Sequence, residues 1–178
     1  MEACLLIASP QMRDPFFERT VVLVWHHDEN GAIGVVVNRV LPHEIPDVLM
    51  IQGLEDTQLH PDNRVSWGGP VETGSGTAIS RTRLNNDEGW QVSGDIAITR
   101  SEDVLSRMLS ENKQVILCLG YAGWGPGQLD AEIEAGGWLF TEATPELVFD
   151  APTEEGYERA LKTLGLTPET VWMQPINE

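Results

Sequence analysis

Two apolar, β-branched runs flank the dipeptide Asn30-Gly31 near the start of the chain. Asn-Gly between two such runs is the strongest short-range signal for a β-hairpin with a two-residue turn, because both residues tolerate positive φ angles. The register that follows pairs Glu29 with Ala32, His27 with Gly34, Trp25 with Val36 and Val24 with Val37. Both faces of residues 20–38 then carry Val, Leu or Trp, so we expect the hairpin in the middle of a sheet that is covered on both sides.

Short strands and helices alternate along the rest of the chain, which predicts one α+β domain over residues 1–178. The expected strands are 4–8, 77–82, 90–92, 96–98, 114–120 and 138–140, and residues 65–70 are expected to form a brief strand that enters a tight glycine turn. The expected helices are a single turn after Asp14-Pro15, a short helix around 48–51, and helices that begin near Ser101, Gln128 and Thr153. No internal repeat or linker interrupts the pattern, and 178 residues are enough for one core.

Charge and composition exclude several classes of protein. There are 28 acidic against 11 basic residues, and the formal charge of −17 repels phosphate backbones, so direct binding of nucleic acid is disfavoured. The longest apolar runs, 20–25 and 32–37, are far shorter than the roughly 20 residues that cross a bilayer. The N-terminus shows no basic head of a secretory signal, so a cytoplasmic location is expected.

Cys4 and Cys118 lie far apart in the sequence, and each is in an apolar, strand-like run. Two reduced, buried thiols are the expectation, since free cysteine is among the most buried residue types. A redox pair would require the fold to bring their Cα atoms within about 7 Å.

The familiar catalytic and metal-binding motifs are incomplete. His26 and His27 are neighbours on a strand and point to opposite faces, and His43 and His60 have no matched ligand, so no metal or other cofactor is predicted. Gly74-Ser-Gly76 lacks the strand-to-helix elbow of a serine hydrolase. With 28 carboxylates in the chain, no single pair stands out as an acid–base couple.

Residues 120–127 are rich in glycine and connect a predicted strand to a predicted helix. Such a loop can bind an anion through backbone N–H groups, but it matches neither common phosphate-binding motif and contains no lysine. The alternative is a packed loop in which Gly123, Gly125 and Gly127 permit positive φ. His27 also has two interpretations: a hydrogen-bonded structural histidine, or a polar group in a pocket opened by Gly34.

Several segments together resemble the YqgE/AlgH family of bacterial proteins. They are residues 6–10 and 14–21, the run 27–38, Gly68-Gly-Pro70, residues 119–124, 127–129 and 132–133, and Trp138-Leu139. The resemblance implies a bifurcated, mostly antiparallel sheet wrapped into a pseudo-barrel with helices outside. It also implies a family without an established enzymatic activity, some of whose members carry a transcriptional-regulator label.

The sequence departs from the family pattern in two places. The stretch after Gly68-Gly-Pro70 usually resembles Arg-Gly-Phe-Val-Leu-His, but residues 74–80 read Gly-Ser-Gly-Thr-Ala-Ile-Ser, so a role of that histidine does not carry over. Residues 40–64 also diverge. No helix–turn–helix with a basic second helix is visible, so a regulator of this kind would act through a protein or a small ligand.

The leading hypothesis is a non-catalytic regulatory domain that binds a small molecule or a protein partner on one concave surface. The residues expected to form that surface are Asp14, Phe16, His27, Asn38, Gly68, Gly69, Pro70, Gly120, Tyr121, Trp124, Gly127 and Gln128. The alternatives are an enzyme that uses His27 as acid–base with Asp14 as its partner, and a regulator that binds DNA directly.

Overall fold

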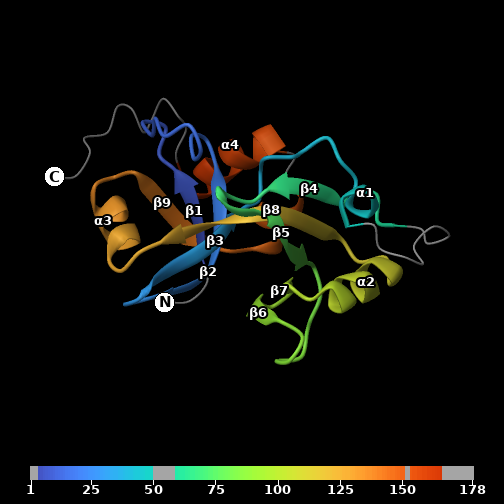
Figure 1. Cartoon of the computed structure of the whole chain (residues 1–178). Coiled ribbons are helices and arrows are strands. Elements are labelled where there is room, and N and C mark those ends of the chain that lie inside the picture. The colour runs from blue at the N-terminus through green and yellow to red at the C-terminus, as the bar shows by residue number, and fades with distance from the viewer. Residues whose placement is uncertain (1–3, 50–58, 151–152, 166–178) are drawn as a thin grey trace.

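Nine strands form one curled sheet with helices at its margins, in a computed structural model that describes residues 4–49, 59–150 and 153–165 (Figure 1). The strands are β1 (Cys4–Ala8), β2 (Val21–Asp28), β3 (Gly31–Val36), β4 (Arg64–Trp67), β5 (Val71–Ser80), β6 (Trp90–Ser93), β7 (Ile96–Thr99), β8 (Val115–Trp124) and β9 (Trp138–Glu142). The helices are α1 (Ile45–Leu49), α2 (Glu102–Ser110), α3 (Gln128–Glu134), the π-helix η1 (Glu146–Asp150) and α4 (Thr153–Thr163). The predicted α+β class is confirmed.

The sheet forks along β8. Its strand order is β6-β7-β5-β8-β3-β2-β1-β9, and β4 pairs with β8 outside this path. The first half of β8 pairs in parallel with β4, and its second half pairs in antiparallel fashion with β3. The two branches are joined where the Val36 backbone N–H donates to the Gly68 carbonyl at 2.9 Å. The bifurcated, mostly antiparallel sheet that the family resemblance implies is therefore present.

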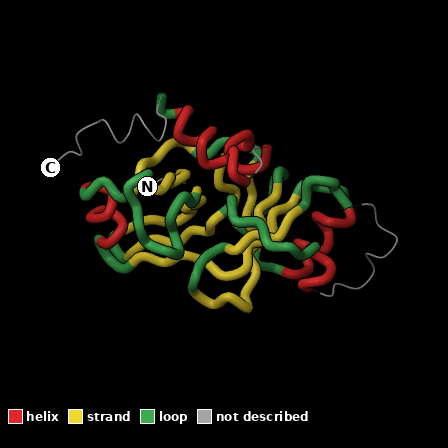
Figure 2. Tube along the Cα trace, turned by 90° about the horizontal axis from the view of Figure 1, so that it is seen from above, coloured by secondary structure: helices red, strands yellow, loops and turns green. Residues whose placement is uncertain are grey.

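The sheet curls until the two ends of its strand path approach each other. Ser93 Oγ on β6 donates to the carbonyl of Ala143, just after β9, at 3.5 Å. Trp25 on β2 packs against Trp90 on β6, with ring centroids 6.2 Å apart. Seen from above, the strands curve around the interior and the helices lie at the periphery (Figure 2). This curvature produces the expected pseudo-barrel.

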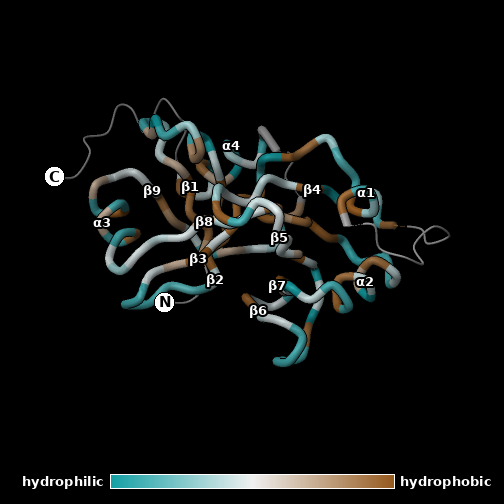
Figure 3. The backbone as a smooth tube through the Cα atoms, viewed as in Figure 1, coloured by the Kyte–Doolittle hydropathy of each residue, from teal (hydrophilic) through white to brown (hydrophobic). Residues whose placement is uncertain are grey.

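Apolar residues concentrate on the strands and polar residues on the connections (Figure 3). The larger core cluster includes β1, β2 and β3, as expected for a central hairpin that is apolar on both faces. A second cluster lies beneath α2, whose buried residues Leu105, Met108 and Leu109 follow helical spacing. Ser101 Oγ accepts the backbone N–H of Val104 at 3.3 Å, so the predicted cap of α2 is confirmed.

The predicted hairpin is correct, but its turn and register are wrong. Asp28 pairs with Gly31, so the turn residues are Glu29 and Asn30, and His27 lies opposite Ala32 instead of Gly34. Gly31 starts β3 with φ +134°, and a Cβ there would lie 2.2 Å from the Trp124 carbonyl oxygen. Glycine is therefore required at position 31, because any side chain there would collide with the backbone of β8. A bulge at Trp25 shifts the remaining pairs, which gives Val24–Gly34 and Val22–Val36.

The remaining local predictions differ from the structure mainly in length. The predicted strand 114–120 continues to Trp124, because β3 and β5 pair with its second half. The single turn expected after Asp14-Pro15 is present, with the Glu18 N–H donating to the Asp14 carbonyl at 2.9 Å. The π-helix η1 was not predicted. The helix expected at 48–51 overlaps α1 only at its first residues, and positions 50 and 51 lie outside the described residues.

Both cysteines are free thiols, but they differ in burial. Cys118 is fully buried and its Sγ lies 3.6 Å from the Val36 carbonyl, whereas Cys4 is only partly buried. The predicted burial holds for Cys118 alone. None of the helices in the described ranges is long and apolar enough to cross a membrane.

Candidate functional site

The turn between β1 and β2 presents one aromatic ring to solvent and partly buries the next. Asp14 Oδ1 accepts the backbone N–H of Phe16 at 2.8 Å, which shapes the turn. The Phe16 ring is 52% exposed and stacks on Trp67 with centroids 6.0 Å apart. Phe17 points inward and packs against Trp124 and Trp138, with ring centroids 6.3 and 5.8 Å from its own. The predicted residues Asp14, Phe16 and Trp124 are thus brought to one aromatic cluster.

Glu132 on α3 holds the inner part of this cluster. Its Oε1 accepts the indole N–H groups of Trp124 and Trp138 at 3.1 and 2.9 Å, and its Oε2 accepts the Gln128 amide at 2.9 Å. The sequence offered a weak signal for this role, a glutamate one turn after Gln128 on a short helix beside a tryptophan-bearing loop. Glu132 was not among the predicted site residues.

The predicted glycines at the fork allow backbone segments to approach each other closely. A Cβ on Gly69 would lie 2.1 Å from the Tyr121 carbonyl carbon, and one on Gly120 would lie 2.3 Å from the Gly69 carbonyl oxygen. Gly68 donates its N–H to the Leu119 carbonyl at 2.7 Å. Gly68, Gly69 and Gly120 are buried in this crossing, whereas Pro70 is exposed beside it. These three glycines therefore let the two backbone segments pack together at the fork.

The glycine-rich segment after Gly120 is mostly strand, which corrects the expectation of a loop over residues 120–127. Tyr121 and Trp124 belong to β8. Gly127 has φ +72° and precedes α3, and the Gly125 N–H already donates to Gln128 Oε1 at 3.0 Å. Of the three glycines expected to permit positive φ, only Gly127 does, so that expectation is wrong for Gly123 and Gly125.

His27 and Asp14 have different partners. His27 is 8% exposed, and its Nε2 lies 3.3 Å from Asp130 Oδ1 near the start of α3. The carboxylate of Asp14 binds its own turn, as described above. Across the described part of the chain, no three His, Cys, Asp or Glu side chains gather as a metal site requires.

A hollow of about 540 Å³ opens beside the turn and next to the aromatic cluster. Its lining comes from the turn, the end of the hairpin and α4: Glu18, Arg19, Asn38, Arg39, Glu155, Tyr157 and Glu158. Asn38 is the predicted site residue that lines it. A smaller hollow of about 150 Å³ lies at the start of α2 and contains none of the predicted site residues.

Asn38 fixes the backbone of Arg19. Its Oδ1 accepts the Val21 N–H at 2.8 Å, and its Nδ2 donates to the Arg19 carbonyl at 3.0 Å. Arg19 has φ +57°, a left-handed conformation that is uncommon for a residue with a side chain. This clamp sets the direction in which the Arg19 side chain leaves the turn.

The Arg19 guanidinium lies over the ring of Tyr157, 4.7 Å from its centroid. The Tyr157 hydroxyl donates to the Ala8 carbonyl at 2.7 Å, so the ring is held from behind. Burial raises the pKa of Tyr157 to about 12, although the charge of Arg19 acts in the opposite direction. The phenol is therefore neutral at physiological pH, and Arg19 rests on a fixed aromatic face.

Arg39 connects the hollow to the exposed aromatic stack. It donates to the Phe16 and Glu18 carbonyls at 2.6 and 2.8 Å, and its guanidinium lies 5.3 Å from the centroid of Trp67. The Arg39 side chain therefore holds the turn, whereas the Arg19 guanidinium makes no hydrogen bond or ion pair within the described residues. Neither arginine, nor Tyr157 or Glu155, was predicted, because their partners lie far away in the sequence.

Comparisons with known proteins agree with this architecture. The model of the AlgH-like family matches residues 5–169. A UPF0301 protein of Rhodospirillum rubrum is 40% identical over 166 residues, which cover 92% of this chain and 86% of the relative. A UPF0301 protein of Vibrio cholerae is 35% identical over 170 residues, which cover 92% and 91%.

Solved structures give the same assignment. The solution structure of the AlgH protein from Pseudomonas aeruginosa matches with a TM-score of 0.73 and 34% identity, over 97% of this chain and 93% of that one. A crystal structure of a Corynebacterium diphtheriae protein matches with a TM-score of 0.77 over 91% and 86% of the two chains, and at 21% identity it shows the shared fold. The chain belongs to the AlgH-like family.

Proposed function

We propose that this chain is a non-catalytic binding domain with a regulatory role, and that its ligand enters the hollow beside Arg19. The observation that carries the proposal is a preorganised arginine whose guanidinium has no hydrogen-bond or ion-pair partner among the described residues. Asn38 holds the backbone of Arg19, Tyr157 supports its guanidinium, and its N–H groups bind no described residue. A group held in its binding geometry beforehand loses less entropy when the ligand arrives.

The backbone of Arg19 supports the same conclusion. A left-handed conformation at a residue with a Cβ costs on the order of 1–3 kcal/mol and persists where the surroundings impose it, often at binding sites. Here the surroundings are the two hydrogen bonds of Asn38. The volume of about 540 Å³ also lies within the roughly 300–1,000 Å³ that is typical of small-molecule sites.

The lining favours binding over covalent chemistry. Among the described residues it contains no serine, cysteine, lysine or histidine, and the phenol of Tyr157 is kept neutral by a pKa of about 12. Guanidinium, carboxylate and amide groups recognise charged and polar ligands without reacting with them. The hollow thus fits a sensor or regulatory subunit.

A thermal-shift screen with a metabolite library tests the proposal. A ligand that binds the folded state raises Tm in proportion to RT ln(1 + [L]/Kd). Hits should lose their shift in Arg19→Ala and keep it in Arg159→Ala, which removes an exposed arginine on the same α4 that does not line the hollow. Hits that shift both variants equally would place the site elsewhere, and silence across the library would contradict a small-molecule site.

An enzyme that uses His27 is a second candidate, supported by the 3.3 Å contact between its Nε2 and Asp130. In this case Asp130 takes the role that we had predicted for Asp14. Any turnover found among the screening hits should then disappear in His27→Gln and persist in Arg19→Ala. The opposite pattern would assign the chemistry to the hollow instead.

Direct regulation of DNA is opposed by the formal charge of −17. A gel shift at low salt separates this function from ligand-mediated regulation, because electrostatic binding is strongest there. Retardation that weakens steeply as salt increases would favour DNA; otherwise regulation passes through a ligand or a protein partner.

A further inference from the structure

We infer that the ligand of this hollow is a zwitterion of short-peptide size, whose carboxylate binds Arg19 and whose ammonium binds the Glu155–Glu158 edge. The inference rests on the proposed function and specifies its ligand class. It begins with the charges of the lining, which combine three carboxylates and two guanidinium groups in one space.

The anionic end of the ligand is assigned to Arg19. The Arg39 guanidinium already donates to two backbone carbonyls, whereas the Arg19 guanidinium has a cation–π contact with Tyr157 and no hydrogen bond or ion pair among the described residues. The planar guanidinium therefore keeps its N–H donors for a ligand. Two parallel N–H donors match a carboxylate, which forms paired, charge-assisted hydrogen bonds with arginine.

The cationic end is assigned to α4. Glu155 and Glu158 are exposed, stand three residues apart on the same face of α4, and both line the hollow, as does Tyr157 between them in the sequence. Neither carboxylate has an ion pair or hydrogen bond within the described ranges, although Arg19 lines the same hollow. Two neighbouring carboxylates repel each other, and an ammonium group placed between them would relieve that repulsion.

The field of the whole protein selects against a ligand that is only anionic. With a formal charge of −17, the surface repels anions as they approach. A ligand that also carries a positive charge gains attraction to Glu155 and Glu158 and still satisfies Arg19. The volume of about 540 Å³ exceeds the needs of a single amino acid and suits a short peptide or a compound of that size.

Isothermal titration calorimetry with three matched probes tests the ligand class on the full chain. The probes are trialanine, its C-terminal amide and N-acetyltrialanine, which carry both charges, only the ammonium and only the carboxylate. We expect trialanine to bind about tenfold or more tightly than either derivative, since each lost charge removes charge-assisted hydrogen bonds.

Variants should then separate the two ends. Arg19→Ala should weaken trialanine about tenfold and leave the amide unchanged. The double variant Glu155→Gln with Glu158→Gln should weaken trialanine and leave N-acetyltrialanine unchanged. Arg159→Ala and Glu134→Gln, which change exposed charges outside the hollow, are the controls and should bind like the parent chain.

The outcomes distinguish the ligand class from the site. If all three probes bind equally and all weaken in Arg19→Ala, the zwitterion is wrong and the proposed binding site remains. If trialanine does not bind, the ligand class is likewise overturned, while the metabolite screen with Arg19→Ala still decides on the site. Probes that bind equally to the parent chain and to Arg19→Ala would overturn both.

Discussion

The two cysteine thiols show how burial sets the reactivity of a side chain. Cys118 lies on β8 between β4 and β5, with no exposed surface. Burial in these apolar surroundings raises the pKa of its thiol to about 12, because the thiolate would lose its hydration. Cys4 is only partly buried, and burial raises the pKa of its thiol as well.

We therefore predict selective alkylation of the native chain. At pH 8, iodoacetamide should modify Cys4 slowly and leave Cys118 unmodified, because the reactive thiolate of Cys118 is neither formed nor accessible. Peptide mapping by mass spectrometry checks this, and denatured protein, in which both thiols react, is the control.

Since the folded pKa of Cys118 exceeds the unfolded value, its contribution to stability is complete below about pH 9 and is lost as the pH rises towards about 12. Rapid native labelling of Cys118 would contradict the burial.

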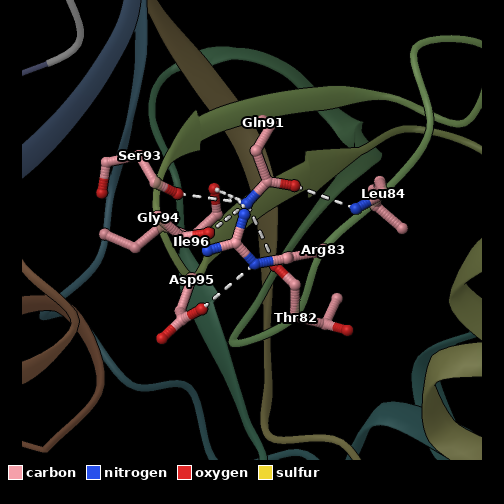
Figure 4. Close-up of polar contacts among 8 residues, drawn as sticks. All are labelled: Thr82, Arg83, Leu84, Gln91, Ser93, Gly94, Asp95 and Ile96. Carbon is pink, nitrogen blue, oxygen red and sulfur yellow. Dashed lines mark hydrogen bonds and ion pairs between the residues drawn. The ribbon is translucent and has the colours of Figure 1, made fainter.

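At the scale of elements, one glutamine organises the β6–β7 hairpin. Gln91 Nε2 lies within 3.2 Å of four backbone carbonyl oxygens, and Gln91 Oε1 accepts the Leu84 N–H at 2.9 Å (Figure 4). The carbonyls belong to Thr82, Ser93, Gly94 and Ile96. An amide has two N–H donors, so these carbonyls share them. Arg83 and Asp95 add an exposed ion pair at 3.7 Å beside this network.

We predict that Gln91→Glu loosens this hairpin. The substitution keeps the shape of the side chain but replaces the donors by a carboxylate that faces four carbonyl oxygens. Because Gln91 is exposed, we expect a loss of about 0.5–1.5 kcal/mol in the free energy of unfolding and faster amide hydrogen exchange in β6 and β7. Asn86→Asp, which adds the same charge at an exposed position in the preceding loop, is the control. Unchanged exchange in Gln91→Glu would mean that the backbone pairs alone maintain the hairpin.

At the scale of the whole molecule, closure of the curled sheet depends on few contacts. Trp90 on β6 is 48% exposed, yet it packs on Trp25 of β2, which lies on the other side of β8 in the strand order. Ser93 and Arg81 reach the segment after β9 near the same seam. The aromatic pair is therefore positioned to resist opening of the pseudo-barrel.

A double-mutant cycle of Trp25→Ala and Trp90→Ala tests this closure. Aromatic pairs contribute about 0.5–1.5 kcal/mol beyond their burial, so we expect a coupling energy of that size in urea unfolding. Pairing Trp25→Ala with Phe140→Ala, an exposed aromatic on β9, provides the control and should give nearly additive effects. Additive losses for Trp25 and Trp90 would show that other contacts close the sheet.

The sequence by itself determined those elements whose causes lie within a few residues. Ser101 caps α2 because the cap and the N–H that it accepts are three residues apart. Gly165 follows α4 with φ +74°, the left-handed conformation that favours glycine at the end of a helix. The apolar runs of β2 and β3 required a central position in any sheet, since both faces need cover.

Tertiary structure decided the features that depend on distant partners. The hairpin turn moved to Glu29-Asn30 because Gly31 must accommodate the Trp124 carbonyl, and β8 continues through the glycines because β3 and β5 pair with it. The hollow joins Arg19 and Asn38 to Tyr157, which comes more than a hundred residues later. Local patterns identified Asn38 but not its neighbours, because a pocket is a property of elements that meet in space, and packing across the sheet is what brings them together.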